Sequence, residues 1–392
     1  MHGPNFVFPN AEVAWSLMIV LYPYITGLVA GAFIVSALYH VAHKKELKPI
    51  ARLALVASFC FCSFATLPLL LHLHHPERAF NVMFTPNFTS AMAGFGFIYS
   101  FYMVVLIIDL WLVFRQDFID RAKSLPGVMG LLYKVLALGV LEMTPKARAI
   151  DKKLIHFFSV IGIPAACVLH GYVGFIFGGV KANPWWSTAL MPVVFLLSAI
   201  VSGLAALVVI YVVISKIRKA PIDLPCFRSL LNYTWLVLIV AVSLETLELA
   251  NRAYEGGHEW EMLSTLITDH LTYTYIPLQI IVGSVIPILL LPFAFRAGAN
   301  PKFMKFAGVL AGLLILVQVF SMRWNVVIGG QLFSKSFRGF IEWEPEFLGR
   351  EGILMAIIVL CLPFITLAVV HKFLPVWGKD RDDTDEEATA AH

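Results

Sequence analysis

The chain has 392 residues, of which 59% are hydrophobic and only 14% are charged, with a formal net charge of +4. Soluble globular domains have about 25% charged residues, so this composition excludes an ordinary soluble protein. The basic residues lie between long apolar runs, which makes the net charge a sign of membrane topology and not of nucleic-acid binding. The composition predicts an all-α, polytopic membrane protein.

About nine apolar segments are long enough to cross a bilayer, whose core of about 30 Å needs about 20 helical residues. They lie at 13–40, 50–72, 89–114, 154–177, 187–214, 230–251, 273–295, 303–322 and 352–371. We expect the first eight to form two four-helix bundles, at 13–178 and 187–324, with an additional C-terminal helix at 352–374. Residues 1–12, 325–351 and 375–392 are expected to form an N-terminal segment, a loop and an acidic tail.

Basic residues follow the first, third, fifth and seventh segments, as at Lys44, Arg115, Lys216 and Arg296. Because cytoplasmic loops carry the excess of Lys and Arg, we expect a multi-pass protein of a bacterial inner (cytoplasmic) membrane with a periplasmic N-terminus and a cytoplasmic C-terminus. The apolar segment 127–142 is short and interrupted by Lys134. It is predicted to be an amphipathic helix on the cytoplasmic surface, with a tenth span as the alternative.

A polar junction at 71–92 separates the second and third spans and contains His72, His75, Arg78 and Asn87. His72 and His75 share a face if the helix extends to both, since residues three apart are neighbours on a helix. Imidazoles exchange protons near neutral pH. The junction is therefore a candidate site for a ligand that takes up or releases protons.

Two further groups of polar residues lie within the first and fourth spans. His170 and Tyr172 stand among glycines near the end of the fourth span; they either contact a ligand or form a hydrogen-bonded structural pair. Tyr22 and Tyr24 of the first span either pack against neighbouring helices or line a ligand slot. Trp185, which follows the fourth span together with Trp186, is predicted to be an interfacial belt residue.

The sixth span carries Glu245, Glu248 and Arg252 on one stripe, where Glu248 and Arg252 can pair. Carboxylates within a membrane must face protein or water, so this stripe is either part of a proton path or an internal salt bridge. Asp109 and Gln279 are predicted to form hydrogen bonds between helices.

The five cysteines lack the paired spacings that bind iron–sulfur clusters or zinc, and the chain has no Cys-x-x-Cys-His haem attachment site. No metal site is predicted. His156 and His170 would lie about 21 Å apart on one helix, but a two-haem cytochrome b needs a matching histidine pair on a facing helix. One haem between His170 and a junction histidine stays an alternative.

Residues 71–80, LHLHHPERAF, followed by PNFTSAM at 86–92, resemble the LDLGRP signature and its sequel in the NrfD family, which includes the polysulfide reductase membrane subunit. The GYVG motif that begins at Gly171 and the stretch from Arg323 to Gln331 are similar to that family as well. The resemblance implies a haem-free subunit that binds menaquinone or ubiquinone non-covalently. It also implies a periplasmic, ferredoxin-like iron–sulfur partner, in a complex with a multihaem cytochrome c or a molybdopterin subunit.

The resemblance also assigns candidate roles to individual residues. Tyr172 stands where the family has its quinone-contacting tyrosine, His72 replaces an Asp of the signature, and His75 replaces a basic residue. The candidate site therefore has four residues for quinone binding and proton exchange, four further contacts and three members of a proton path: His72, His75, His170 and Tyr172; Tyr22, Tyr24, Arg78 and Asn87; Asp109, Glu245 and Glu248. A haem b-binding anchor, a structural anchor and a transporter without quinone chemistry are the alternatives.

Overall fold

The computed structural model describes residues 13–87, 89–333 and 339–377. The predicted N-terminal segment 1–12 and most of the predicted acidic tail, 378–392, lie outside these residues. The longer helices of the first half are α1 (Leu17–His40), α2 (Lys48–Ala65), α5 (Ala91–Ser124) and α7 (Pro145–Gly178). Those of the second half are α8 (Met191–Arg218), α9 (Leu224–Glu255), α11 (Ile286–Phe295), α12 (Pro301–Val327) and α13 (Ile353–Phe373).

Shorter helices connect or extend these. They are η1 (Lys45–Leu47), α3 (Leu67–His72), η2 (Pro76–Arg78), α4 (Asn81–Phe84), α6 (Gly127–Leu136), α10 (Gly257–Thr265), η3 (Leu266–His270), η4 (Thr274–Val285) and η5 (Gly329–Gln331). Within the described residues, nine helical segments are long and apolar enough to cross a membrane, which confirms the predicted all-α, polytopic architecture. One of them joins η1, α2 and α3, and another joins η4 and α11.

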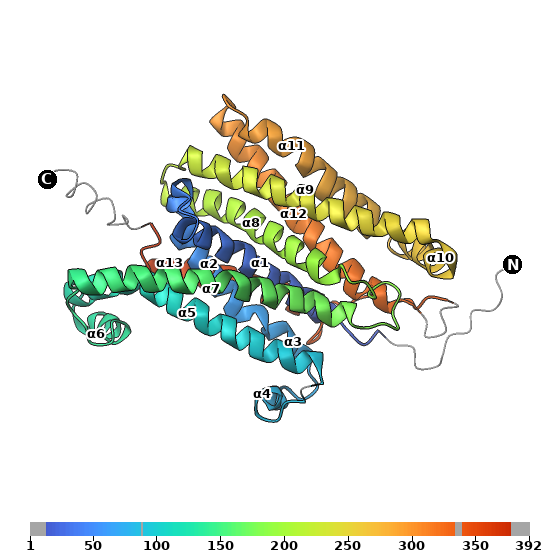
Figure 1. Ribbon diagram of the computed structural model, residues 1–392, viewed down its shortest axis with the longest axis horizontal. Coiled ribbons are helices and arrows are strands. Elements are labelled where there is room, and N and C mark those ends of the chain that lie inside the picture. Colours follow the sequence, from blue (N-terminus) through green and yellow to red (C-terminus); the bar gives the residue numbers. More distant parts are fainter. Residues whose placement is uncertain (1–12, 88, 334–338, 378–392) are drawn as a thin grey trace.

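The helices pack in two groups. In the first group α1 contacts α2 and α7, while α5 contacts α7 and α2; in the second, α8 and α12 contact each other, and α9 packs on α8 and α11. The groups meet where α1 and α7 pack on α8, and α13 packs on α2 (Figure 1). The α1–α8 contact brings the backbones close together, because a β-carbon added at Gly31 would overlap the Ile200 carbonyl oxygen and Gly203.

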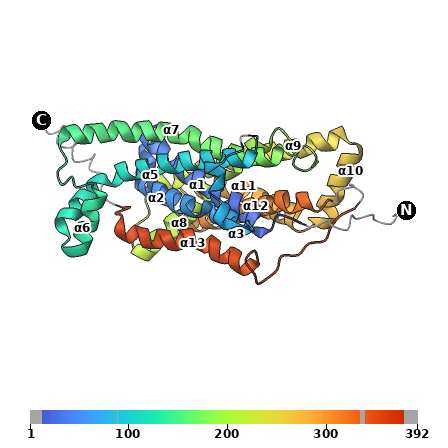
Figure 2. The same cartoon turned by 90° about the horizontal axis from the view of Figure 1, so that it is seen from below.

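The bundle has two distinguishable ends. The α3, α4 and α10 helices lie at one end, which we call the α10 end, and α6 lies at the opposite end, the α6 end (Figures 1 and 2). The connections that follow α1, α5, α8 and α11 all lie at the α6 end (Figure 1), and Lys44, Arg115, Lys216 and Arg296 belong to these connections or to the C-terminal parts of the helices before them.

The α6 helix differs from its predicted extent of 127–142. It ends at Leu136, because Leu138 and Gly139 adopt positive φ angles of 54° and 75° that are incompatible with a continuing α-helix. A helix of ten residues is about 15 Å long and too short to cross a bilayer. The indole N–H of Trp111 on α5 donates to the Leu136 carbonyl oxygen at 2.8 Å and holds the end of α6 against α5.

The predicted loop 325–351 also begins later, because α12 continues to Val327 and is followed by η5. Gln331 of η5 binds both backbone polar groups of Trp15, accepting from its N–H at 2.7 Å and donating to its carbonyl oxygen at 3.0 Å. The entry to α1 is thus fixed to the end of α12.

Candidate functional site

The polar junction begins with His72, the last residue of α3. Its Nδ1 lies 2.9 Å from Glu351 Oε2 and 3.5 Å from the hydroxyl of Ser16, the N-cap of α1. The guanidinium of Arg350 donates to the carbonyl oxygens of Leu71 and Leu73. The segment before α13 is therefore held against the end of α3, and His72 and Glu351 form an ion pair whenever the imidazole is protonated.

The other predicted contacts of the junction, His75, Arg78 and Asn87, are exposed. His75 lies beyond the end of α3, so it does not share a helical face with His72; its Nδ1 is 3.0 Å from Glu77 Oε1. Arg78 is exposed in η2. The Asn87 side-chain oxygen accepts from the N–H and the hydroxyl of Thr89 at 3.1 and 2.7 Å, which stabilises the turn before α5.

Tyr172 of α7 lies against the first turn of α5. A β-carbon added at Gly94 would overlap its hydroxyl, so the glycine leaves room for the phenol. On the next residue, the Phe95 ring packs edge-on against Tyr22 of α1, with 5.1 Å between centroids. The Tyr22 hydroxyl is buried and has no hydrogen-bond partner among the described residues. We call Tyr22, Gly94, Phe95 and Tyr172 the tyrosine site.

His170 faces away from Tyr172, since positions two residues apart on a helix point about 200° apart. It lines a narrow crevice between the two halves, too small to hold a water molecule, together with Phe195 and Arg323. Both His170 ring nitrogens are buried without partners in the part of the chain that the structure describes. Tyr24 does not join either group, since its hydroxyl donates to the Leu316 carbonyl oxygen at 3.3 Å.

Arg323 is 1% exposed and makes its hydrogen bonds to neutral groups. Its Nη2 donates to the Ser198 hydroxyl at 2.7 Å and to the Phe195 carbonyl oxygen at 3.2 Å, and its guanidinium lies 3.9 Å from the centre of the Phe195 ring. The side chain thus turns inward between α8 and α12 and does not reach the surface.

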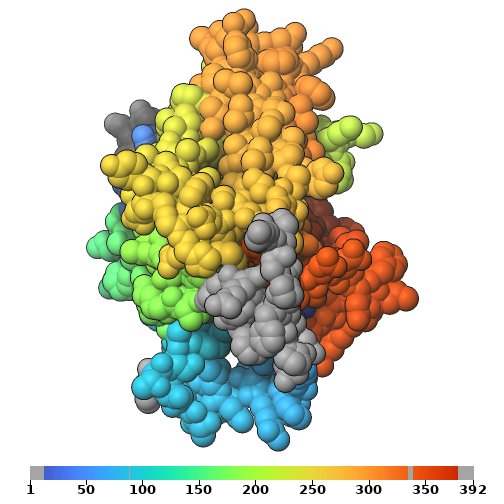
Figure 3. Space-filling model, turned by 90° about the vertical axis from the view of Figure 1, so that its right-hand side faces the viewer, coloured from blue at the N-terminus to red at the C-terminus, as the bar shows by residue number. Residues whose placement is uncertain are grey.

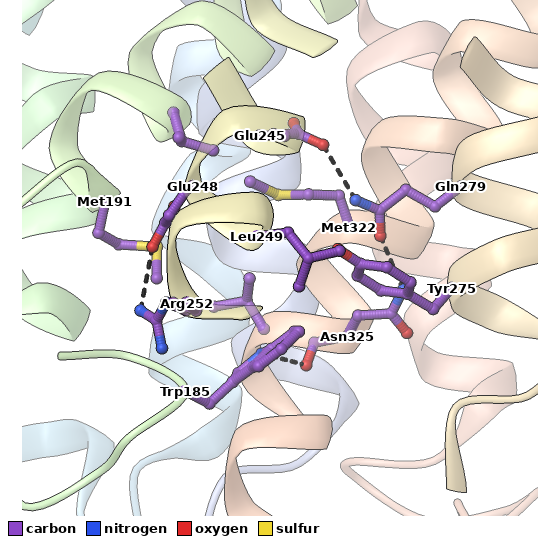
Figure 4. A pocket seen from close by; sticks show the side chains of 12 residues that line it. Trp185, Met191, Glu245, Glu248, Leu249, Arg252, Tyr275, Gln279, Met322 and Asn325 are labelled. Carbon is purple, nitrogen blue, oxygen red and sulfur yellow. Dashed lines mark hydrogen bonds and ion pairs between the residues drawn. The ribbon is translucent and has the colours of Figure 1, made fainter. Parts of the chain in front are cut away.

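A larger cleft opens in the second half, between α9, η4, α12 and the loop before α8 (Figure 4). It encloses about 60 Å³, and we call it the α9 cleft. Gln279 of η4 donates from Nε2 to Glu245 Oε2 at 3.0 Å and accepts from Asn325 Nδ2 at 2.8 Å. Glu245 Oε1 and Asn325 Oδ1 are buried and have no partner within residues 13–87, 89–333 and 339–377.

The predicted pair of Glu248 and Arg252 lies at the mouth of the α9 cleft, with 3.0 Å between Glu248 Oε1 and Arg252 Nη2. Both residues also line a wider groove at the α10 end, of about 690 Å³, which extends along α9 and α10. Seen from this end, the α10 region and the junction after α3 lie on opposite sides of the molecule (Figure 3). The α9 cleft and the junction are therefore separate features of the α10 end.

Asp109 is the other carboxylate of the predicted proton path. It is fully buried on α5 and accepts from the Ser159 hydroxyl of α7 at 3.2 Å. The α5 and α9 helices lie on opposite sides of the bundle (Figure 1). The structure thus brings Glu245 and Glu248 together in one cleft and places Asp109 elsewhere.

A family model described as NrfD, polysulphide reductase, matches residues 6–335. The chain belongs to the NrfD family. The matched region contains both the tyrosine site and the α9 cleft, whereas α13 and Glu351 follow it.

Three relatives match most of this NrfD-family protein. It is 26% identical to a selenate reductase subunit of Mesobacillus selenatarsenatis, over 94% of this protein and 87% of the relative. It is 25% identical to the Hdr-like menaquinol oxidoreductase integral membrane subunit of Archaeoglobus fulgidus, over 85% and 75%. A polysulfide reductase polypeptide of Wolinella succinogenes is 24% identical, over 82% and 95%.

Sequence reasoning missed the site roles of Trp185 and Asn325. Trp185 and Trp186 are buried, and their indole N–H groups donate to the α12 carbonyl oxygens of Asn325 and Val326 at 3.0 and 2.6 Å, so the interfacial belt prediction is wrong. Gln279 does form the predicted hydrogen bonds between helices. The sequence did carry one signal near Gln279, because Pro277 interrupts the helical hydrogen bonds two residues before it. In the structure η4 is a π-helix, a form that is frequent at functional sites.

Proposed function

We propose that this NrfD-family protein is the membrane subunit of a respiratory oxidoreductase complex and exchanges electrons between menaquinone or ubiquinone and an iron–sulfur partner. The names of its relatives, a menaquinol oxidoreductase subunit and components of selenate and polysulfide reductases, support this proposal. Basic residues gather in the connections at the α6 end, so the α10 end faces the periplasm and receives the partner. That partner belongs with a molybdopterin or a multihaem cytochrome c subunit.

The quinone headgroup binds at the tyrosine site, and the buried, unpartnered hydroxyl of Tyr22 carries this assignment. A buried hydroxyl without a partner loses its hydrogen bonds to water without replacement. A quinone carbonyl oxygen is an acceptor and supplies that missing partner. Tyr172 is half-buried and lies beside Gly94 near the start of α5, where its phenol can approach the same ring from the lipid side.

Protons reach the tyrosine site from the α10 end through His72. Quinone reduction takes up two electrons and two protons, and the reverse reaction releases them. Ser16, which lies beside His72, is six residues before Tyr22, about 9 Å along α1. The His72–Glu351 pair therefore stands above the phenols and can pass protons to them. His170 and the proton path through Asp109, Glu245 and Glu248 remain predictions of the sequence.

Removal of one phenol hydroxyl tests the proposal. We expect Tyr172→Phe to lower the rate of quinone-coupled electron transfer by at least about tenfold, the effect of losing a hydrogen bond to the reacting ring, while the complex still assembles. The matched control is Tyr211→Phe, since Tyr211 lies near the α6 end, where its hydroxyl accepts from the Asp223 N–H. Equal rates in Tyr172→Phe, Tyr22→Phe and the control would contradict quinone binding at the tyrosine site.

A further inference from the structure

The α9 cleft has the lining of a site for a ring-shaped ligand and adjoins a groove of sufficient size. The cleft itself holds about 60 Å³, and the groove along α9 and α10, with which it shares Glu248 and Arg252, holds about 690 Å³, within the range of small-molecule pockets. Most of the wall of the cleft is apolar or aromatic and comes from Trp185, Met191, Leu249, Tyr275 and Met322. Glu245, Gln279 and Asn325 form a chain of hydrogen bonds on one side of the cleft, and the paired Glu248 and Arg252 lie on another side (Figure 4).

The hydrogen bonds from Glu245 through Gln279 to Asn325 leave two acceptor atoms without a partner among the described residues. An ionised carboxylate only accepts, so Gln279 donates its NH₂ group to Glu245 and must use its oxygen toward Asn325. Asn325 in turn donates its NH₂ group to Gln279. The atoms left over, Glu245 Oε1 and Asn325 Oδ1, are both acceptors, and both are buried without a partner among the described residues.

A network that served packing alone would satisfy all of its members, because a buried acceptor without a donor is costly. Two unfilled acceptors beside a cavity instead indicate a ligand that brings two donors. Arg252 of the same cleft is paired with Glu248, so it does not supply the missing donors. A neutral ring with two hydroxyl groups fits both the acceptors and the apolar wall.

We propose that the α9 cleft is a second ligand site, selective for the reduced form of the quinone pool, the hydroquinone. An oxidised quinone has only acceptors and would set its carbonyl oxygens against Glu245 and Asn325. The ligand enters through the groove along α9 and α10, where Leu244, Leu247 and Met262 provide apolar wall for its tail. The identification of the ring as a quinol, though not the pattern of acceptors, rests on the proposed function.

The test is the binding of a tritiated decylbenzoquinone to the full-length protein in nanodiscs, in its oxidised form and, under anaerobic reduction, as the hydroquinone. For the unmodified protein we expect two sites per molecule, of which one binds the reduced probe at least about tenfold more tightly than the oxidised probe. That ratio corresponds to about 1.4 kcal/mol.

Glu245→Gln is the decisive variant, because it keeps the shape of the side chain and replaces the free acceptor oxygen with an NH₂ donor. The site should then lose its preference for the reduced probe and favour the oxidised one. The matched control is Glu261→Gln on α10, whose carboxylate is exposed outside the cleft. A Glu245→Gln protein with the original preference would overturn the proposal.

Leu249→Trp provides an independent variant, since it fills the cleft and leaves every polar group in place. It should reduce the count from two sites to one, with loss of the reduced-form site. If Glu245→Gln does not fold, Leu249→Trp alone tests whether the α9 cleft binds the reduced probe. Retention of both sites in Leu249→Trp would overturn the proposal, and so would a second site that binds the two forms of the probe equally in the unmodified protein.

The same measurement separates this proposal from the tyrosine site. A single site that is lost in Leu249→Trp and unaffected by Tyr172→Phe would support the α9 cleft and overturn the tyrosine site. A single site with the opposite sensitivities would support the tyrosine site and overturn the α9 cleft.

Discussion

The tyrosine site and the α9 cleft lie in different halves of the bundle and offer opposite hydrogen-bonding groups. The tyrosine site presents phenol hydroxyls, of which that of Tyr22 is buried without a partner in the described structure, whereas the α9 cleft presents the unpartnered acceptors of Glu245 and Asn325. Donors suit the carbonyl oxygens of a quinone, and acceptors suit the hydroxyls of a hydroquinone. The comparison shows that the polar atoms left without partners, more than the residue types, indicate which ligand a membrane site accepts.

The two buried carboxylates make the same point. Asp109 accepts from Ser159 and lines none of the cavities described above, while Glu245 has one oxygen bonded to Gln279 and the other free beside a cleft. A carboxylate within a membrane span is thus not by itself evidence of a ligand site.

The largest effect should come from separating the two halves. Gly31→Leu would place a side chain where the α1 and α8 backbones meet, so we expect at least about 3 kcal/mol of lost stability or no folded protein. Size-exclusion profiles and thermal unfolding of the purified protein measure this. In the control, Gly171→Ala, the new β-carbon would lie 3.9 Å from the Pro192 oxygen, an ordinary contact, and folding should be unchanged. A folded Gly31→Leu protein would show that the halves need no close contact.

A smaller effect is expected from Gln279→Met, which removes the amide that joins Glu245 to Asn325. Both neighbours lose a buried hydrogen bond, which costs about 2–4 kcal/mol in total, and the reduced probe should lose its preference. Unfolding of the variant in detergent measures the first effect. Gln318→Met is the matched control, because the Gln318 oxygen is buried without a partner among the described residues and its loss leaves no such donor unpaired. Equal losses in the two variants would contradict the importance of this chain of hydrogen bonds.

Gly94→Ala changes the tyrosine site alone. The new methyl group overlaps the Tyr172 hydroxyl and displaces the phenol, so the KM for the oxidised quinone should rise by about tenfold, as for one lost hydrogen bond. In Gly96→Ala, two residues on, the new methyl group would lie 3.3 Å from side-chain atoms of Met83 and Val82, away from Tyr172, and should leave KM within about twofold. If both variants behave alike, Tyr172 does not contact the ring.

The spans were predictable because each must bury or expose to lipid about 20 apolar residues, a pattern that hydropathy records directly. The pairing of Glu248 with Arg252 was predictable as well, since it follows from helical spacing. The end of α6 was not, because apolar residues continue to Leu141 although the backbone turns at Leu138.

The site residues were less predictable for a physical reason. Spacing along one helix does not tell which face a neighbour covers, so His170 and Tyr172 were grouped although they face different helices. The Trp185 indole and the Asn325 carbonyl meet only because α12 packs beside the loop before α8. Contacts of this kind depend on tertiary packing and leave no periodic pattern in the sequence.

The smallest effect concerns the entrances of the two sites, each of which carries an ion pair. The pair at the α9 cleft has a permanent cation, Arg252, whereas the pair above the tyrosine site joins Glu351 to a histidine. Partial burial raises the pKa of Glu351, but hydrogen bonds from Ser16 and His72 and the nearby charges outweigh it and hold that pKa below its ordinary value of 4.5.

A carboxyl whose pKa is lower in the folded state stabilises the fold above its unfolded pKa, and this contribution is lost as the pH falls through the folded pKa. Wild-type protein should therefore lose about 1–2 °C more than Glu351→Gln when unfolding is followed from pH 6 to below pH 4, as expected for a partly exposed pair. Glu342→Gln, a carboxyl in the same segment, should behave as wild type. If Glu351→Gln kept the full wild-type pH dependence of unfolding, the His72–Glu351 pair would not stabilise the entrance of the tyrosine site. The contrast between the two entrances would then be lost.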